Sequence, residues 1–573
     1  PTTSGDYNID IDRYRLGPEY RQVMLAAREL NQGDLPPEAR TWQNQRLQYT
    51  HGYGVVMSPV NRVDAEGLPE YFLSGIPVVS TRPELKVDVP QIYYGELTND
   101  YVFVNTKQNE FDYPSVEGSN KETRYAGTGG VRLGSYLRRV AWSIRLGDAN
   151  MLLSSDLTPD SRILYRRNIR ERVQRVAPFL NWDNDPYLVV NKGRLLWLLD
   201  GYTVTDRYPY SKPFRAGTGL PGVGQTFNYI RNSVKAVVDA YNGTVTLYAF
   251  DERDPILQTW SRIFPDLLTP KEQMPEGLRA HLRYPEDLFR IQRDIYTLYH
   301  IQDPRVYYGK EDVWAVPADP SPSADEDGSM RADSVARKLQ PYYLIMRLPG
   351  EKKEEFLVMT PFTPLGRENV SAWMCAKCDP EDYGQLLVYR FPKGLNINGP
   401  QQIMNQIKAD PQVSQFQTLM GQRGSRVIFG NLLVIPVEKS LLYAVPVYVQ
   451  AAGTGAAIIP AIKRVIVATD DTVEMRDTLE QAIAALASGT PAASAPSPLQ
   501  VDVTQEPTPA PSASARPTPP GEGASPAELV RRASAAYERA RQKQREYDSA
   551  LEDLGRALDA LKRGIGGAGA QDR

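Results

Sequence analysis

Pairs of apolar runs joined by short turns constrain this fold more than any other feature of the sequence. The first pair, YLVVNKGRLLWLLD, turns at Lys192-Gly193, and the second, VKAVVDAYNGTVTLYAFD, turns at Asn242-Gly243, the strongest short signal for a β-hairpin. A third pair, YYLIMRLPGEKKEEFLVMTPF, turns through a charged loop. RVIFGNLLVIPVEKSLLYAVPVYV and KRVIVA form a late group of strands. The sequence therefore predicts antiparallel sheets.

Four segments have the apolar spacing of helices. Intervals of three and four residues, followed by Gly33, predict a helix in PEYRQVMLAARELNQG (18–33). Helices are also predicted in VRLGSYLRRVAWSI (131–144), in SRILYRRNIRERVQRVAPFL (161–180) and from near Asp471. Because helices come early and hairpins come in clusters, we expect an α+β fold with mixed helices and antiparallel hairpins, rather than a parallel sheet.

Composition divides the chain into five parts. Residues 1–315 form an α+β region, 316–340 a loop or linker, and 341–487 a second, β-rich α+β region. Residues 488–524 are rich in Pro, Ala and Ser and bury too little apolar area to offset the entropy of ordering, so we expect a disordered spacer. Residues 525–565 are predicted to form an amphipathic helix, which Ser525 would cap.

The predicted C-terminal helix carries a heptad seam. Its apolar side chains alternate by four and three residues: Tyr547, Leu551, Leu554, Leu558, Leu561 and Ile565. A lone helix with such a seam needs a partner, which is either a second copy of the chain or the parent domain.

Bulk properties exclude some classes of protein. The 573 residues carry a formal net charge of -3, which gives no global field to attract nucleic acid or an anionic membrane, and no nucleic-acid partner is expected. No apolar stretch reaches the roughly 20 residues of a membrane-spanning helix. The chain opens on PTTSGDYNIDIDRY without an initiator methionine or signal peptide, so we expect a piece of a longer protein.

The stretch YTHGYGVVMSPVN resembles the lining of an active site, because it places Tyr49 and His51 among glycines and a serine. The other histidines are His281 and His300. None of the three has the spacing of a metalloprotease helix or a zinc finger, and a structural histidine is the alternative at each position.

Two aspartate pairs stand beside predicted hairpins, Asp183 with Asp185 in NWDNDP and Asp251 with Asp254 in FDERDP. Paired carboxylates can hydrolyse glycosides or ligate calcium. Asn-Asp and Asp-Pro also form ordinary turns, and the sequence leaves both interpretations open.

Other motifs lack parts that their chemistry needs. GGVRLGS imitates a phosphate-binding loop but has no lysine to reach the phosphates, and no G-x-S-x-G elbow occurs. Cys375 and Cys378 form a C-x-x-C that suits a redox dithiol or half of a metal site, or else two structural thiols. No cofactor and no metal are expected. Replacing both cysteines by serine is expected to leave folding nearly unchanged.

Several long blocks together resemble the soluble part of uncharacterised protein family 0182. They include YRQVMLAARELN, TWQNQRLQYTHGYGVVMSPVN, KQNEFDYPS, NYIRNSVKAVVDAYNGTV and GSRVIFGNLLVIPVEKSLLY, and the resemblance covers roughly residues 7 to 480. It implies the extracytoplasmic portion of a large bacterial multi-pass membrane protein. Arg46, where relatives commonly have histidine, and Cys375 and Cys378, where cysteines are not expected, depart from the pattern and disfavour an indispensable metal site there.

Two functions are compatible with these observations. The first is a binding or scaffold module that serves its own membrane segment or an envelope glycan, lipid or protein. The second is an envelope hydrolase or transferase acting on glycan or lipid through Asp183 and Asp251 with Tyr49 or His51. A deep cleft in which His51 meets two carboxylates would favour the enzyme, whereas scattered positions would favour the binding module.

Overall fold

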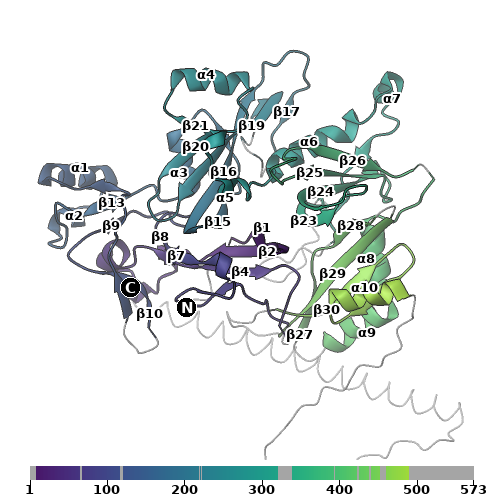
Figure 1. The fold of residues 1–573 in the computed structure, drawn as a ribbon, viewed down its shortest axis with the longest axis horizontal. Coiled ribbons are helices and arrows are strands. Elements are labelled where there is room, and N and C mark those ends of the chain that lie inside the picture. The colour runs from purple at the N-terminus through teal and green to yellow at the C-terminus, as the bar shows by residue number, and fades with distance from the viewer. Residues whose placement is uncertain are drawn as a thin grey trace, which may run out of the picture. The chain divides into compact units, whose positions relative to one another are not determined.

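The computed structural model describes residues 8–64, 67–115, 120–217, 220, 222, 224–320, 338–392, 394–421, 425–437, 440–451 and 460–488. They belong to one compact unit that ends at Ala493, and its fold is α+β (Figure 1). Apart from Ser488, the spacer and the heptad helix predicted at 488–524 and 525–565 lie outside the described residues, as does most of the loop predicted at 316–340.

The N-terminal and central sheets build the first part of the unit. The N-terminal sheet is antiparallel, in the order β1 (Asp10–Leu16), β2 (Glu19–Ala27), β4 (Val55–Pro59), β5 (Leu73–Ser74), β6 (Val79–Ser80). The central sheet has the order β14 (Asn181–Trp182), β16 (Gly193–Thr205), β19 (Tyr229–Asp239), β20 (Val245–Ala249), β21 (Leu268–Pro270), and both β15 (Tyr187–Asn191) and the parallel strand β7 (Val87–Val89) also pair with β16.

Two more sheets follow along the chain. One has the order β22 (Trp314–Ala315), β24 (Glu354–Pro364), β25 (Ala372–Lys377), β26 (Leu386–Arg390), with β23 (Tyr342–Arg347) paired to β24. The other has the order β27 (Ser425–Phe429), β29 (Ser440–Ala451), β30 (Ala461–Ala468), β31 (Val473–Arg476), with β28 (Leu433–Val437) paired to β29. The small sheets are β12 (Val131–Arg132) with β13 (Arg162–Leu164) and β9 (Val102–Val104), β10 (Glu110–Pro114) with β11 (Asn120–Thr123), β17 (Phe214–Arg215) with β18 (Thr226–Phe227), and β3 (Gly52–Tyr53) with β8 (Gln91–Ile92).

Helices lie between and beside these sheets: α1 (Tyr136–Leu146), α2 (Asn150–Leu153), α3 (Ile169–Val176), α4 (Pro255–Ile263), α5 (Glu276–Arg279), α6 (Glu286–Tyr299), α7 (Pro304–Gly309), α8 (Pro400–Ala409), α9 (Pro411–Met420), α10 (Leu479–Ser488). Within the described ranges, none of these helices has the length and apolarity that crossing a membrane requires.

The predicted hairpins are confirmed. In β15–β16, Asn191 pairs with Arg194 across Lys192 and Gly193, and both turn residues have positive φ (49° and 77°), as a tight hairpin turn requires. β19 and β20 form the second hairpin, but its turn is wider than two residues. The side chain of Asp239 causes this, because it accepts hydrogen bonds from the next backbone N–H groups of the turn.

The helix predicted at 18–33 is wrong, because these residues form β2. Val23, Leu25 and Ala27 are buried in alternation, while β1 and β4 pair with the strand on its two sides. The helical spacing omitted Leu25, which is 1% exposed. Tertiary pairing therefore overrode a local pattern that suited a helix.

The other predicted helices are confirmed in part. The segment 131–144 contains α1, which begins after the N-cap Ser135. The segment 161–180 contains α3 only from Ile169, because its first residues form β13 and Arg166 has a positive φ of 49° that no helix accommodates. The last helix begins at Leu479 rather than near Asp471, since β31 comes first and pairs with β30.

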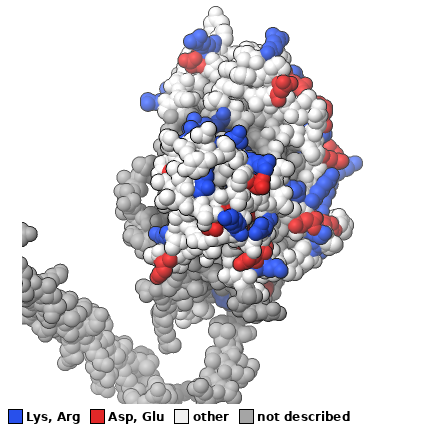
Figure 2. Space-filling model, turned by 90° about the vertical axis from the view of Figure 1, so that its left-hand side faces the viewer, with Lys and Arg blue, Asp and Glu red and all other residues white. Residues whose placement is uncertain are grey.

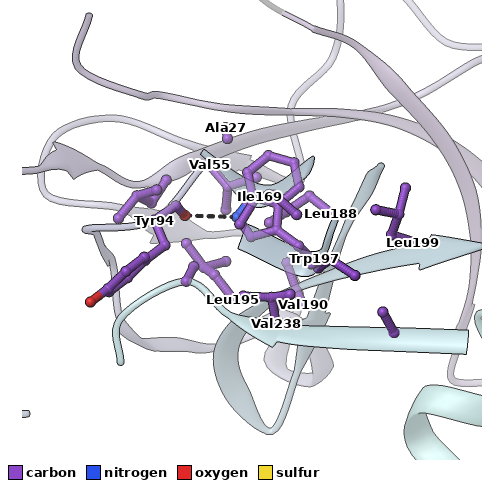
Figure 3. Close-up of a cluster of buried hydrophobic side chains, with 14 of the residues drawn as sticks. Ala27, Val55, Tyr94, Ile169, Leu188, Val190, Leu195, Trp197, Leu199 and Val238 are labelled. Carbon is purple, nitrogen blue, oxygen red and sulfur yellow. Dashed lines mark hydrogen bonds between the residues drawn. The ribbon is translucent and has the colours of Figure 1, made fainter. Parts of the chain in front are cut away.

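A buried apolar cluster joins the N-terminal and central sheets (Figure 3). Trp197 is 1% exposed, and its indole Nε1 donates a hydrogen bond to the Tyr94 carbonyl at 2.9 Å, so the buried ring keeps no unpaired donor. The side chains around it come from both sheets and α3: Ala27, Val55, Ile169, Leu188, Val190, Leu195, Leu199 and Val238.

Hydrogen bonds tie the first strands to residues far along the chain. The buried guanidinium of Arg13 on β1 donates to the carbonyls of Leu282, at 2.8 Å, and Cys378, at 3.1 Å. On β2, the Gln22 amide donates to the Tyr343 carbonyl at 2.8 Å. The bonds to Cys378 and Tyr343 hold residues that precede position 321 against residues that follow position 337.

Candidate functional site

His51 lies in a closed cluster with two carboxylates. Its Nε2 lies 3.2 Å from Asp112 Oδ1, and its Nδ1 lies 2.8 Å from the Thr50 hydroxyl. That hydroxyl donates to Glu110 Oε2 at 2.5 Å, and the Tyr93 hydroxyl donates to the same oxygen at 2.8 Å. Glu110 and Asp112 stand two residues apart on β10, whose pairing with β11 is irregular between Phe111 and Tyr113, and both approach the His51 ring.

The partners of His51 fix its charge. The Thr50 hydroxyl has one proton and donates it to Glu110, so it can only accept a hydrogen bond from His51 Nδ1. Nε2 of the same ring donates to the Asp112 carboxylate. Burial lowers the pKa of His51, but its interactions with the Asp112 and Glu110 carboxylates outweigh burial and raise the pKa above its usual value. A histidine that donates from both nitrogens has no lone pair free to act as a general base.

The cluster is almost closed to solvent. The side chain of His51 is 0% exposed, and those of Glu110 and Asp112 are 2% and 10% exposed. Tyr49, the neighbouring candidate, is half-buried with its ring edge-on to Phe111, 5.4 Å between centroids. The arrangement is suited to locking the segment around β3 onto β10.

Asp183 lies in a separate buried network. It accepts hydrogen bonds from the Tyr202 hydroxyl and from the Asp185 backbone N–H, the latter at 3.0 Å. Burial, reinforced by the nearby carboxyls of Asp287 and Asp200, raises the pKa of Asp183 well above its usual value.

The same network holds a buried lysine. Lys235 donates to Asp200 and to the Tyr383 hydroxyl, at 2.6 Å from the latter. Burial lowers the pKa of Lys235 although Asp200 opposes this. Arg283 closes the network through Asp185, at 3.1 Å.

The second aspartate pair has structural partners. Asp251 accepts from Arg231 at 2.8 Å. Asp254 caps α4 by accepting from the Ile256 backbone N–H, and also accepts from the Tyr229 hydroxyl at 2.7 Å. Burial raises the pKa of Asp254, but its hydrogen bonds exceed this effect and lower the pKa below its usual value.

The four sequence candidates therefore lie in three places. Tyr49 and His51 adjoin each other, whereas Asp183 and Asp251 lie elsewhere, and within the described ranges no hydrogen bond or ion pair joins either aspartate to His51. Sequence reasoning missed Glu110 and Asp112. The signal in the sequence was the E-x-D spacing in KQNEFDYPS, because carboxylates two residues apart lie on one side of a regular strand; β10 itself is irregular at Asp112.

The remaining histidines and the cysteines also have structural partners, and of these four residues only His281 is partly exposed. His281 Nδ1 lies 2.8 Å from Asp12 Oδ2, and His300 stacks on Trp314 with 3.7 Å between ring centroids. Cys375 and Cys378 are both free and fully buried, and burial raises the pKa of the two thiols to about 12 and about 11. Across the described ranges, no group of three or more His, Cys, Asp or Glu side chains is placed to hold a metal ion.

A groove of about 780 Å³ lies between the arm formed by β17 and β18 and the helix α6, and none of the four candidates lines it. One wall is the stacked pair Tyr208 and Tyr229, with 5.5 Å between ring centroids, and the bond from Tyr229 to Asp254 fixes this wall. Most of the lining is aromatic or aliphatic: Tyr210, Phe214, Phe227, Ile230, Ile291, Ile295, Leu298, Tyr299, Val313 and Leu365.

We call this surface the tyrosine groove; its lysines have no carboxylate partner among the described residues, whereas its aspartate is paired. Lys212 and Lys310 line it, are exposed, and have no carboxylate partner among the described residues. Asp294 also lines the groove but is paired with Arg293 at 3.1 Å and with Lys338 at 3.5 Å. The groove is thus an apolar surface with two unpaired cations, the arrangement of a binding site for an apolar or amphipathic ligand.

Comparisons with known proteins give a consistent family assignment. The model of a family described as Uncharacterised protein family (UPF0182) matches residues 7–420. The chain is 47% identical over 476 residues to a UPF0182 protein of Pelotomaculum thermopropionicum, covering 83% of this chain and 49% of that protein. It is 48% identical over 494 residues to one of Moorella thermoacetica, covering 86% and 52%, and 46% identical over 560 residues to one of Alkaliphilus metalliredigens, covering 97% and 57%. The chain therefore spans about half the length of the curated relatives that it matches. No solved structure matches it.

Proposed function

We propose, from the premise that this chain belongs to the uncharacterised protein family UPF0182, that it is the extracytoplasmic portion of a multi-pass membrane protein and acts there as a binding module. The family resemblance supports the membrane context. About half the length of the relatives lies outside the matched region, which leaves room for such a membrane part.

The observation that carries the binding role is the tyrosine groove. Its apolar lining is open to solvent, with Tyr210 fully exposed and Tyr208 and Tyr299 52% and 46% exposed. Exposed apolar surface of this kind in a globular protein commonly marks an interaction site. The ligand that fits is an apolar segment of an envelope partner or of the protein's own membrane part, with any negative charge directed to Lys212 or Lys310.

The competing function is a hydrolase or transferase centred on His51, and one observation favours it: His51 meets two carboxylates. Two features weigh more heavily against it. The imidazole donates from both nitrogens, and the whole cluster is enclosed, so no substrate reaches the ring without displacing Thr50 or Tyr93.

A dye-binding experiment tests the groove. The apolar, anionic dye 1-anilinonaphthalene-8-sulfonate is titrated into the purified 573-residue chain. Ile295→Glu, which places a charge of the same sign as the dye in the groove, is expected to weaken dye binding by roughly tenfold. The matched control is Ile263→Glu, on α4, where the isoleucine is 53% exposed and outside the groove.

Equal dye affinity in the two variants, with unchanged thermal unfolding in both, would show that the groove does not bind the dye and would remove the main support for this proposal. Thermal unfolding is the necessary check because partly unfolded proteins also bind this dye.

A further inference from the structure

The outward side of α1 is apolar, which is unusual for a helix at the surface of a globular protein. Leu137 and Ile144 are 79% and 78% exposed, and Tyr136, which begins the helix, is 65% exposed. Leu153 on the adjacent α2 is 81% exposed. Large aliphatic side chains are seldom exposed to this extent over so short a segment, so this surface calls for a partner.

Helix geometry accounts for the apolar side. At 3.6 residues per turn, Leu137, Ala141 and Ile144 share one side of α1. The opposite side holds Trp142, which packs against Tyr165, and Arg139, which bonds the carbonyls of the α2 region. The helix therefore binds the protein through a side that also carries Trp142 and Leu146, and it presents a second apolar stripe to solvent, where an amphipathic helix usually has polar side chains.

Unpaired arginines flank the stripe. Arg138 and Arg145 are exposed, and neither has a carboxylate partner in the described part of the chain. Although the whole chain has a net charge of -3, residues 120–180 contain twelve lysines and arginines against five aspartates and glutamates. On the side of the molecule where α1 lies in Figure 1, blue Lys and Arg side chains gather near the middle of the face in Figure 2.

We propose that α1 rests on an anionic lipid surface, with Leu137 and Ile144 in the boundary between headgroups and acyl chains and with Arg138 and Arg145 on lipid phosphates. Helices that lie in this boundary combine an apolar stripe with cationic flanks. The guanidinium fork matches a phosphate group geometrically. This contact is separate from the tyrosine groove and does not depend on it.

A lipid surface fits α1 better than a second protein does. A stable protein interface buries about 800 Å² on each partner, whereas the stripe is one three-turn helix with an adjoining leucine. A weak, reversible lipid contact needs only a few apolar side chains when cations add to it. The unpaired arginines give the charge complementarity that an anionic bilayer supplies.

A fluorescent label on the stripe tests the contact. In the full 573-residue chain, Ile144→Cys is labelled with a nitrobenzoxadiazole thiol reagent. Cys375 and Cys378 are buried, so the reagent does not reach them. Vesicles with about one phosphatidylglycerol in three lipids are expected to shift the label's emission to the blue, because its surroundings become apolar. Leu419→Cys on α9, where the leucine is 57% exposed, is the matched control and is expected to show no shift.

Vesicle flotation of unlabelled variants measures how much the apolar stripe and the flanking arginines each contribute to lipid binding. Leu137→Ser with Ile144→Ser is expected to lower vesicle binding roughly tenfold. Arg138→Gln with Arg145→Gln is expected to weaken binding and to reduce its dependence on salt. The control pair, Leu395→Ser with Leu419→Ser, removes two exposed leucines elsewhere and is expected to bind like the unmodified chain.

Two results would overturn the proposal. One is equal binding to these vesicles and to pure phosphatidylcholine vesicles, with no effect of the stripe variants. The other is a dimer in sedimentation that the Leu137→Ser and Ile144→Ser pair disperses while vesicle binding persists, since this would assign the stripe to a second copy.

Discussion

Asp10 is a buried carboxyl group whose protonation changes with pH in the range that cells use. It is 4% exposed and accepts a hydrogen bond from the Leu188 backbone N–H at 2.9 Å. Burial raises the pKa of Asp10 from 3.8 to about 7, although Arg283 opposes the shift. The folded state therefore retains a proton that the unfolded chain releases at lower pH.

The sign of the stability effect follows from this difference. The contribution of Asp10 is complete below pH 3.8 and is lost as pH rises through about 7. We expect Asp10→Asn, which can still accept the bond from Leu188, to flatten the fall in unfolding free energy between pH 4.5 and 8 by an amount on the order of 4 kcal/mol. Urea denaturation at each pH measures it. The exposed Asp34→Asn is the control, and an equal slope in Asp10→Asn and the unmodified chain would contradict the assignment.

The two cysteines are expected to respond differently to substitution. Cys375 packs among Leu348, Leu357 and Trp373, so Cys375→Ser buries an unpaired hydroxyl and is expected to cost about 1–3 kcal/mol. The Cys378 thiol accepts the Tyr284 backbone N–H at 3.3 Å, and a serine oxygen there keeps that bond. Urea midpoints of the two single variants check the order, and a larger loss for Cys378→Ser would contradict it.

The sequence led us to expect that serine could replace both cysteines with almost no effect on folding, whereas the structure predicts a loss of stability at Cys375. The C-x-x-C spacing gave no sign that one thiol lies among apolar side chains and the other accepts a backbone hydrogen bond. Both environments depend on sheet pairing and on Tyr284, 94 residues before Cys378. Similarly, His51 could be singled out from its neighbours in sequence, but its partner Asp112 lies 61 residues away on β10.

At the scale of elements, hairpins with a recognisable turn could be predicted, but the hairpin of β1 and β2 was missed. A hairpin joins neighbours in sequence, so its turn residues specify it locally, as Lys192 and Gly193 do. β2 pairs on one side with β4, about 30 residues later, and its helix-like composition outweighed a weak alternation. The tyrosine groove was not predicted for a related reason, because its walls come from separate elements.

Substitutions in β2 test directly whether these residues form a strand and not the helix that the sequence predicted. A helix would bury Val23 and Met24 together, whereas the strand buries Leu25 and leaves Met24 half-exposed. We expect Leu25→Ala to lower the unfolding free energy by about 2–5 kcal/mol and Met24→Ala to lower it by about 1 kcal/mol or less. Urea denaturation of both variants measures this, and the opposite order would be inconsistent with β2.

At the scale of the whole molecule, the proposed topology predicts where protease cuts. The segment 488–523, of which only Ser488 lies within the described residues, is rich in Pro, Ala and Ser, and its length would reach roughly 10 nm if extended. Protease added to intact cells is expected to cut first within it and to release the C-terminal segment as one fragment. Complete protection until the cells are lysed would place this part of the chain in the cytoplasm.

The bonds of Arg13 also set the order of events when the chain is made. The carbonyls that it reaches belong to residues 269 and 365 positions later. At a synthesis rate of about 5–20 residues per second, β1 waits roughly 20 to 70 seconds for the last of them. During that interval the guanidinium that later lies in the interior still faces water. A ribosome stalled before residue 378 would therefore display a chain in which Arg13 lacks the Cys378 carbonyl that it bonds in the finished fold.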